Sequence, residues 1–236
     1  MTTRTVVTSP LIYARVAGFL YLTMVPLGFF GNYGHSMLIV PGDAATTVNN
    51  ILASASLFRL SIMSALMVQI VNILMVLVLY KLLKPVNRNH AVLMVIFILV
   101  AAPIAMLNEL NQFAALLLLS GVDYLTAFEA GQLQAQVMFF LDLHEHGIKV
   151  AFIFWGLWLF PMGYLVFKSG FLPKILGVLL IIGCFGYLLD SVRFFFFPSF
   201  GPIVNYTFWG ELLLPLWLLI KGVNVEQWEK RVLESA

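Results

Sequence analysis

The chain has 236 residues, of which 61% are hydrophobic and only 10% are charged. An average soluble domain has roughly 45–50% apolar and about 25% charged residues, so this composition excludes an ordinary soluble globular protein. Lys and Arg number 13 and Asp and Glu 11, for a net charge of +2, and no basic segment with interleaved aromatic residues occurs. We therefore expect no nucleic-acid partner. The single cysteine, Cys184, cannot form an intrachain disulfide. The solvent for most of the surface is predicted to be lipid.

Six apolar segments are long enough to span a bilayer, whose hydrocarbon core of about 30 Å requires about 20 residues of helix. The expected spans are 13–31, 60–84, 91–120, 147–168, 174–197 and 203–220. Arg15 directly precedes the first apolar stretch, and no A-x-A-like cleavage site follows Phe30. The first segment is therefore expected to be a retained helix and not a signal peptide.

Two stretches between the spans, 44–56 and 126–143, mix apolar and polar residues at helical spacing. They are expected to form short amphipathic helices that lie on the bundle or in the membrane interface. The predicted fold class is therefore all-α: a polytopic membrane protein with a single domain, residues 1–236, formed by a six-transmembrane-helix bundle with two short outer helices.

Basic residues are concentrated on one side of this six-span arrangement, and positive residues near short loops stay in the cytoplasm. Only Arg59, Lys149 and Arg193 fall toward the other side. The basic residues expected to be cytoplasmic are Arg4, Arg15, Lys81, Lys84, Arg88, Lys168, Lys174, Lys221, Lys230 and Arg231. Both termini are therefore predicted to be cytoplasmic, and the two long connections are predicted to lie outside.

Polar residues enter the predicted spans, where an ionisable side chain costs at least about 2.5–3.5 kcal/mol at the bilayer centre. In the third span, a face about 160° wide carries Asn108, Glu109, Asn111 and Gln112. In the fifth span, Asp190 and Arg193 are three residues apart and can pair along the helix. Each such group needs a partner, a cavity or a functional role.

The ionisable residues share a depth in the outer half of the predicted bundle, and we hypothesise that they line one outward-opening polar cavity. The alternative is an internal network of salt bridges and hydrogen bonds that fixes the register of the helices. The residues expected to bind a ligand are Arg59, Asn108, Glu109, Gln112, His144, Asp190, Arg193 and Glu211.

The segment 142–146, with the sequence DLHEH, resembles a metal site, but His144 and His146 are about 200° apart on a continuous helix. His144 is expected to point into the bundle. Beside a buried carboxylate it would be a proton carrier or, with two carboxylates, a metal ligand; the alternative is a structural histidine. His35 and His90 are expected in loops without a role. We expect no bound metal or cofactor.

No established catalytic motif is present. The first hypothesis is a non-enzymatic protein that binds, transports or senses a small polar or amphipathic ligand. The alternative is an intramembrane enzyme acting on a lipid or isoprenoid head group, with a metal or a nucleophile such as Ser191. Its catalytic residues would be His144, Glu109, Asp190 and Glu211. The expected partners are the lipid bilayer, a small-molecule or lipid ligand and, in a homo-oligomer, a second copy of the chain.

Several stretches carry a family resemblance: 14–18 (ARVAG), 58–60 (FRL), 80–86 (YKLLKPV) and above all 154–191, which includes SGFLP and GYLLDS. Together they resemble the bacterial integral-membrane family known as domain of unknown function 4386. The resemblance implies a prokaryotic inner-membrane protein with six spans, and it implies no activity. It places Arg15, Arg59, His144 and Asp190 inside or beside family motifs.

Overall fold

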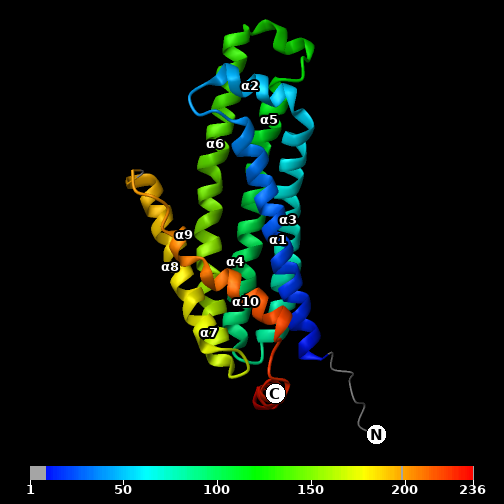
Figure 1. Ribbon diagram of the computed structural model, residues 1–236, viewed down its shortest axis with the longest axis vertical. Helices are drawn as coiled ribbons and strands as arrows, with labels where there is room; N and C mark the ends of the chain where they lie inside the picture. Colours follow the sequence, from blue (N-terminus) through cyan, green and yellow to red (C-terminus); the bar gives the residue numbers. More distant parts are fainter. Residues whose placement is uncertain (1–8, 198, 236) are drawn as a thin grey trace. The chain divides into compact units, whose positions relative to one another are not determined.

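The computed structural model describes residues 9–197 and 199–235, and within them the regular structure is helical, with no strand. The helices are α1 (Pro10–Leu38), α2 (Ala44–Ala53), α3 (Ala55–Leu83), α4 (Arg88–Asn108), α5 (Leu110–Leu118), the 3-10 helix η1 (Asp123–Ala127), α6 (Ala130–Leu157), α7 (Leu159–Ser169), α8 (Lys174–Phe196), α9 (Val204–Thr207), α10 (Trp209–Ile220) and α11 (Val225–Glu234). The predicted all-α fold class is confirmed (Figure 1).

The helices have the length and the apolar surface that a bilayer requires. Large apolar side chains such as Phe19, Leu60, Leu99 and Phe185 are exposed along them. In the described residues, five segments can cross a membrane: Pro10–Leu38, Ala55–Leu83, Arg88–Leu118, Ala130–Ser169 and Lys174–Phe196. Val204–Ile220 and Val225–Glu234, bent by 104°, give a sixth if they are counted as one span. The chain is therefore a polytopic helical membrane protein.

One of the two expected outer helices is present, and the other is part of a longer helix. Helix α2 forms where predicted, and the Asp43 side chain caps it by accepting a hydrogen bond from the Thr46 amide at 2.9 Å. The stretch 126–143 instead contributes the end of η1 and the first half of α6, which continues to Leu157. No Gly or Pro occurs between residues 132 and 146 to end the helix. The outer segment is therefore continuous with the first part of the predicted fourth span, and α7 forms the rest of that span.

The chain folds into two compact units. The first unit contains residues 9–23, 71–101 and 152–235, and the second contains residues 24–70 and 102–151. Helices α1, α3, α4 and α6 each continue from one unit into the other. The single domain expected from the sequence stays a prediction.

The second unit has an apolar core beneath α2, which crosses the ends of α1 and α3 (Figure 1). Val48 and Ile51 of α2 pack with Phe58 and Ile62 of α3, and α5 and α6 complete the cluster. Because these side chains are buried on every side, α2 fixes the ends of the helices between which the polar residues of this unit lie.

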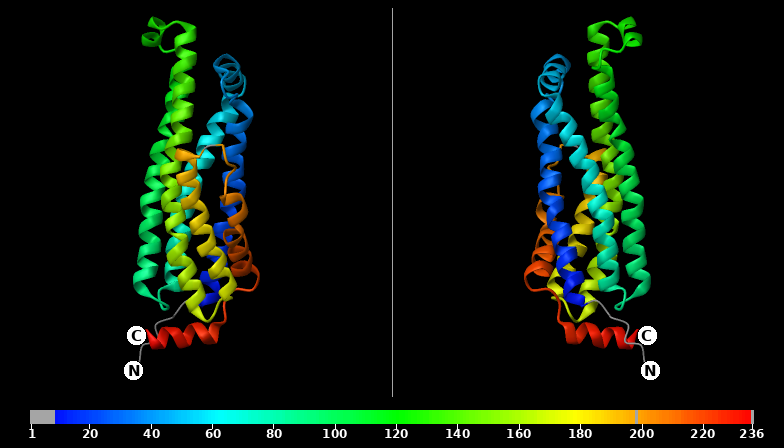
Figure 2. Two further views of the ribbon diagram at one scale, coloured as in Figure 1. Left: turned by 90° about the vertical axis from the view of Figure 1, so that its left-hand side faces the viewer. Right: turned by 90° about the vertical axis from the view of Figure 1, so that its right-hand side faces the viewer.

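In the first unit, α11 is docked across the ends of the helices beside it (Figure 2). The indole nitrogen of its buried Trp228 donates to the Leu82 carbonyl of α3 at 2.8 Å. The Arg231 guanidinium donates to the carbonyls of Lys168 and Ser169 at the end of α7. These bonds satisfy carbonyls that a helix end leaves without intrahelical partners, so α11 is a structural part of this unit.

Candidate functional site

Glu109 lies at a break in the helix predicted as the third span. Helix α4 ends at Asn108 and α5 begins at Leu110, and the Glu109 amide donates to the Met106 carbonyl at 3.2 Å, a one-residue-tighter turn. The residue is only 4% exposed. The break therefore holds a carboxyl group in the interior of the second unit.

Glu109 forms a compact polar cluster with Gln112 of α5 and His144 of α6. The Gln112 side-chain nitrogen donates to Glu109 Oε2 at 2.8 Å. His144 Nε2 lies 3.1 Å from Glu109 Oε1 and 3.0 Å from the Gln112 nitrogen. The prediction that His144 points into the bundle is confirmed. The enzyme hypothesis required His144 to be within bonding distance of a carboxylate, and the contact with Glu109 meets this requirement.

The geometry of the cluster defines two positions for a proton. With Glu109 ionised, the Gln112 nitrogen and not its oxygen faces the carboxylate, since the oxygen would meet a second acceptor. When His144 Nε2 carries a hydrogen, it donates to Glu109; when Nε2 is unprotonated, it accepts from Gln112, and Glu109 then needs its own proton to bond to it. His144 Nε2 therefore has a hydrogen-bond partner in either tautomer.

His35 extends the cluster from the end of α1. Its ring centroid lies 5.6 Å from that of His144. His35 Nδ1 and Gln112 Oε1 are buried and make no close hydrogen bond among the described residues, and the Gln112 side chain is the hydrogen-bonding neighbour of His35. The expectation that His35 lies in a loop is wrong, because α1 continues for seven residues past the predicted end of the first span, to Leu38. The expectation for His90 is also wrong, since it lies in α4 and stacks on Tyr164 at 4.2 Å.

Asn108 sets the position of His144. Its side-chain nitrogen donates to the His144 carbonyl at 2.8 Å, and its side-chain oxygen accepts from Asn111 at 3.1 Å. Gly147 lies one turn beyond on α6, and a Cβ there would overlap the Asn108 side-chain oxygen. The absence of a side chain at Gly147 thus allows α6 to approach closely enough for His144 to reach Glu109.

Asp190 and Arg193 of the first unit form a structural lock, a set of hydrogen bonds that connects α8 with the start of α9 and the segment before it. The Arg193 Nε donates to Asp190 at 2.9 Å, which confirms the predicted pairing along the helix. The same carboxylate accepts from the amides of Ile203 and Val204 at 2.7 and 2.8 Å, and Arg193 donates to the Phe200 carbonyl. For this pair, the contacts favour an internal network that holds the helices in register over a role in a ligand cavity.

The remaining predicted residues occupy different surroundings. Glu211, in the first turn of α10, accepts from the Tyr21 hydroxyl at 3.3 Å, and the Tyr187 side chain is its second hydrogen-bonding neighbour. Arg59 is exposed on α3. Glu109 belongs to the second unit, whereas Asp190 and Glu211 belong to the first. One cavity shared by all of them stays a prediction.

In the described part of the chain, no group of three or more His, Cys, Asp or Glu side chains is arranged to hold a metal ion. His144 and Glu109 supply two such ligands at one place. The Ser191 hydroxyl, the candidate nucleophile, donates to the Tyr187 carbonyl one turn earlier at 3.0 Å. The chemistry that the Glu109–Gln112–His144 cluster itself supports is proton transfer and hydrogen bonding.

Comparisons with known proteins place the chain in a family. The family model described as domain of unknown function (DUF4386) matches residues 16–222. An uncharacterized protein of the archaeon Archaeoglobus fulgidus is 36% identical over 168 residues, which cover 71% of this chain and 86% of that protein. No solved structure matches. The resemblance predicted from the motifs is confirmed, and the chain belongs to the DUF4386 family.

Proposed function

We propose that this chain is a membrane transporter or sensor that binds a small polar or amphipathic ligand at the Glu109–Gln112–His144 cluster and couples binding to the protonation of the Glu109–His144 pair. The observation that carries the proposal is the position of His144 Nε2, within hydrogen-bond distance of both Glu109 and Gln112. Carboxylate and histidine chains inside membrane helices are typical of proton relays and substrate pathways.

The chemistry of the ligand follows from the acceptor atoms of the cluster. Gln112 Oε1 is a buried acceptor that makes no close hydrogen bond and has the His35 side chain as its neighbour, and the Glu109 carboxylate has lone pairs beyond those used by Gln112 and His144. A ligand that supplies hydrogen-bond donors, such as an ammonium or hydroxyl group, would satisfy them. Leaving such groups unsatisfied costs about 1–3 kcal/mol each, so this ligand class is favoured over one that offers acceptors alone.

The site is proposed to open to the outside of a prokaryotic inner membrane. The basic residues of the α3–α4 and α7–α8 turns favour a cytoplasmic position for those turns and for both termini. The connections that contain α2 and η1 would then lie outside. Reporter fusions to the C-terminus and to the α5–α6 connection test this orientation: alkaline phosphatase should be active only at the connection. Activity at the C-terminus contradicts it.

The binding proposal is tested on the purified full chain in nanodiscs. Its unfolding temperature is measured with zwitterionic amino acids, polyols and polyamines, each added singly at neutral and mildly acidic pH. At least one class is expected to raise the unfolding temperature of the wild type, with a size that depends on pH. Glu109→Gln keeps the shape of the side chain but removes the ionisable group, and should abolish the shift while the unliganded protein stays folded.

Glu145→Gln is the matched control, because Glu145 is the exposed neighbour of His144 on the same helix. It should behave like the wild type. The proposal is contradicted if no compound raises the unfolding temperature of the wild type by more than it raises that of Glu109→Gln. Collapse of Glu109→Gln in the absence of any compound favours a purely structural cluster.

The His144–Glu109 contact also keeps the intramembrane enzyme as a second candidate, since a buried histidine paired with a carboxyl group is a general acid–base arrangement. This candidate would act on a lipid or isoprenoid head group. Elemental analysis of the purified protein tests its metal-dependent form. A stoichiometric metal that is lost in His144→Ala and retained in His146→Ala favours the enzyme.

A further inference from the structure

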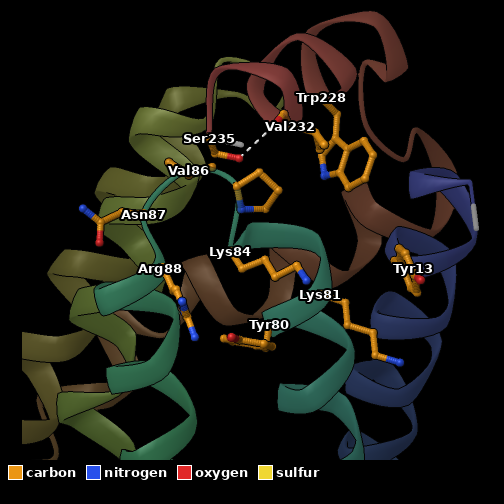
Figure 3. A pocket seen from close by; sticks show the side chains of 11 residues that line it. Tyr13, Tyr80, Lys81, Lys84, Val86, Asn87, Arg88, Trp228, Val232 and Ser235 are labelled. Atoms are coloured by element: carbon orange, nitrogen blue, oxygen red, sulfur yellow. Dashed lines mark hydrogen bonds between the residues drawn. The ribbon is translucent and has the colours of Figure 1, made fainter. Parts of the chain in front are cut away.

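A basic cavity of about 730 Å³ lies in the first unit, between the α3–α4 turn and α11. Three cationic side chains line it: Lys81 and Lys84 from the end of α3, and Arg88 from the start of α4. Figure 3 shows Lys84 between Arg88 and Lys81, with the Tyr80 ring beneath them. From the sequence, these residues indicated the orientation of the protein, and Lys81 and Lys84 also lie in the family stretch 80–86; no site was expected there.

The charge of this basic cavity is of one sign. None of its lining residues is Asp or Glu, and no acidic side chain among the described residues forms an ion pair with Lys81, Lys84 or Arg88. All three cations are exposed at the wall. Cations gathered without counter-charges repel one another, and an anion placed among them removes that repulsion.

The opposite wall is rigid and partly aromatic. Trp228 is buried and fixed by its bond to the Leu82 carbonyl, and the Lys81 nitrogen lies 6.0 Å from the Tyr13 ring centroid. Tyr13 and Tyr80 bring hydroxyl groups to the lining, and the Ser235 hydroxyl there donates to the Val232 carbonyl at 3.0 Å. The basic cavity thus combines three cationic side chains with hydroxyl groups and apolar ring faces. Its volume is within the range of small-molecule sites.

We propose that the basic cavity binds a phosphate group, carried either by an anionic phospholipid head group or by a soluble organic phosphate. Lys and Arg clusters recognise phosphate through charge-assisted hydrogen bonds. The adjoining apolar surfaces of Tyr13 and Trp228 hold the organic part of the ligand. The location at the ends of the spans, beside the amphipathic α11, favours the lipid source, because basic sites next to membrane helices bind anionic head groups.

The test uses the purified full chain and two probes. In one arm, native mass spectrometry counts phosphatidylglycerol retained from mixed micelles, with zwitterionic phosphatidylcholine, whose net charge is zero, as the reference. In the other, glycerol 1-phosphate is titrated against the protein in lipid-free detergent, and the unfolding temperature is followed. The triple variant Lys81→Gln, Lys84→Gln, Arg88→Gln should weaken the binding on the order of a hundredfold, and Lys84→Gln alone about fivefold.

The matched control is the triple variant Lys174→Gln, Lys221→Gln, Lys230→Gln, which removes the same charge from residues that do not line the basic cavity. Lys81→Arg with Lys84→Arg should retain binding. Selective loss of phosphatidylglycerol in the first triple variant supports a lipid ligand, and selective loss of the glycerol 1-phosphate shift supports a soluble one. If both triple variants bind both probes equally, or if the wild type binds neither, the proposal is overturned.

Discussion

Gly147→Ala tests how the second unit positions its polar cluster. Position 147 is the point on α6 where a Cβ would overlap the side-chain oxygen of Asn108. The Asn108 amide holds the His144 carbonyl at 2.8 Å, so a methyl group at 147 must displace either Asn108 or the whole of α6. Both changes move His144 away from Glu109.

The expected loss of stability has three parts. Overpacking a close helix contact costs about 1–3 kcal/mol. Loss of the bond from Asn108 to the His144 carbonyl adds about 0.5–1.5 kcal/mol. The greater helix preference of alanine offsets about 0.5–1 kcal/mol. The net expectation is that Gly147→Ala lowers the free energy of unfolding by about 1–3 kcal/mol.

The free energy of unfolding is measured by denaturant titration in mixed micelles, with Gly131→Ala as the control on the same helix, where an added Cβ meets nothing within 4 Å. That control should be neutral or slightly stabilising. Asn108→Ala combined with Gly147→Ala removes the overlap, so the double variant should be more stable than the sum of the two single changes by about 1 kcal/mol. A Gly147→Ala variant as stable as Gly131→Ala refutes the account of this contact.

Three further outcomes are expected. Asp190→Asn should lower the free energy of unfolding by about 2–4 kcal/mol in the same titration, because the carboxylate accepts three hydrogen bonds; wild-type stability would show that the lock contributes nothing. Trp228→Phe removes the bond to the Leu82 carbonyl and part of the buried ring, and should speed tryptic cleavage within α11; unchanged cleavage rates would contradict the docking account. Hydrogen bonds from Thr46 lower the pKa of Asp43. Because this pKa is lowered in the folded state, its capping contribution is present above the ordinary aspartate pKa and is lost as the pH falls through the lowered value. Amide exchange in α2 should therefore accelerate in acid, relative to its intrinsic rate, in the wild type but not in Asp43→Asn; equal pH profiles would contradict the capping.

Five of the six expected spans could be predicted from the sequence because hydropathy and helix length are local properties. The predicted boundaries at Lys84, Lys174 and Ile220 each lie within one residue of a helix end in the structure. The ends of α1 and α6 were missed for one reason: polar residues continue each helix past its apolar stretch. Charge and hydropathy mark where a span leaves the lipid, and they do not mark where the backbone stops being helical.

The candidate site was only partly predictable, since its geometry depends on contacts between distant segments. The spacing on one helical face predicted that Glu109 and Gln112 lie together, and the angle between His144 and His146 predicted that His144 points inward. His35 was missed because the helix that carries it was expected to end at Gly31. The close approach at Gly147 has no local signal beyond the glycine itself. The basic cavity requires α11 to return to the end of α3, a contact between residues 146 positions apart.

The most direct measurement of the central claim is the protonation of His144 on ligand binding. Solid-state NMR of histidine-¹⁵N-labelled protein in bilayers resolves its ring nitrogens, which are assigned by their loss in His144→Ala. The compound that stabilises the wild type is then added. The account predicts that the Nε2 resonance changes its protonation state in the wild type and not in Glu109→Gln. A resonance that is unchanged while the compound binds would contradict it.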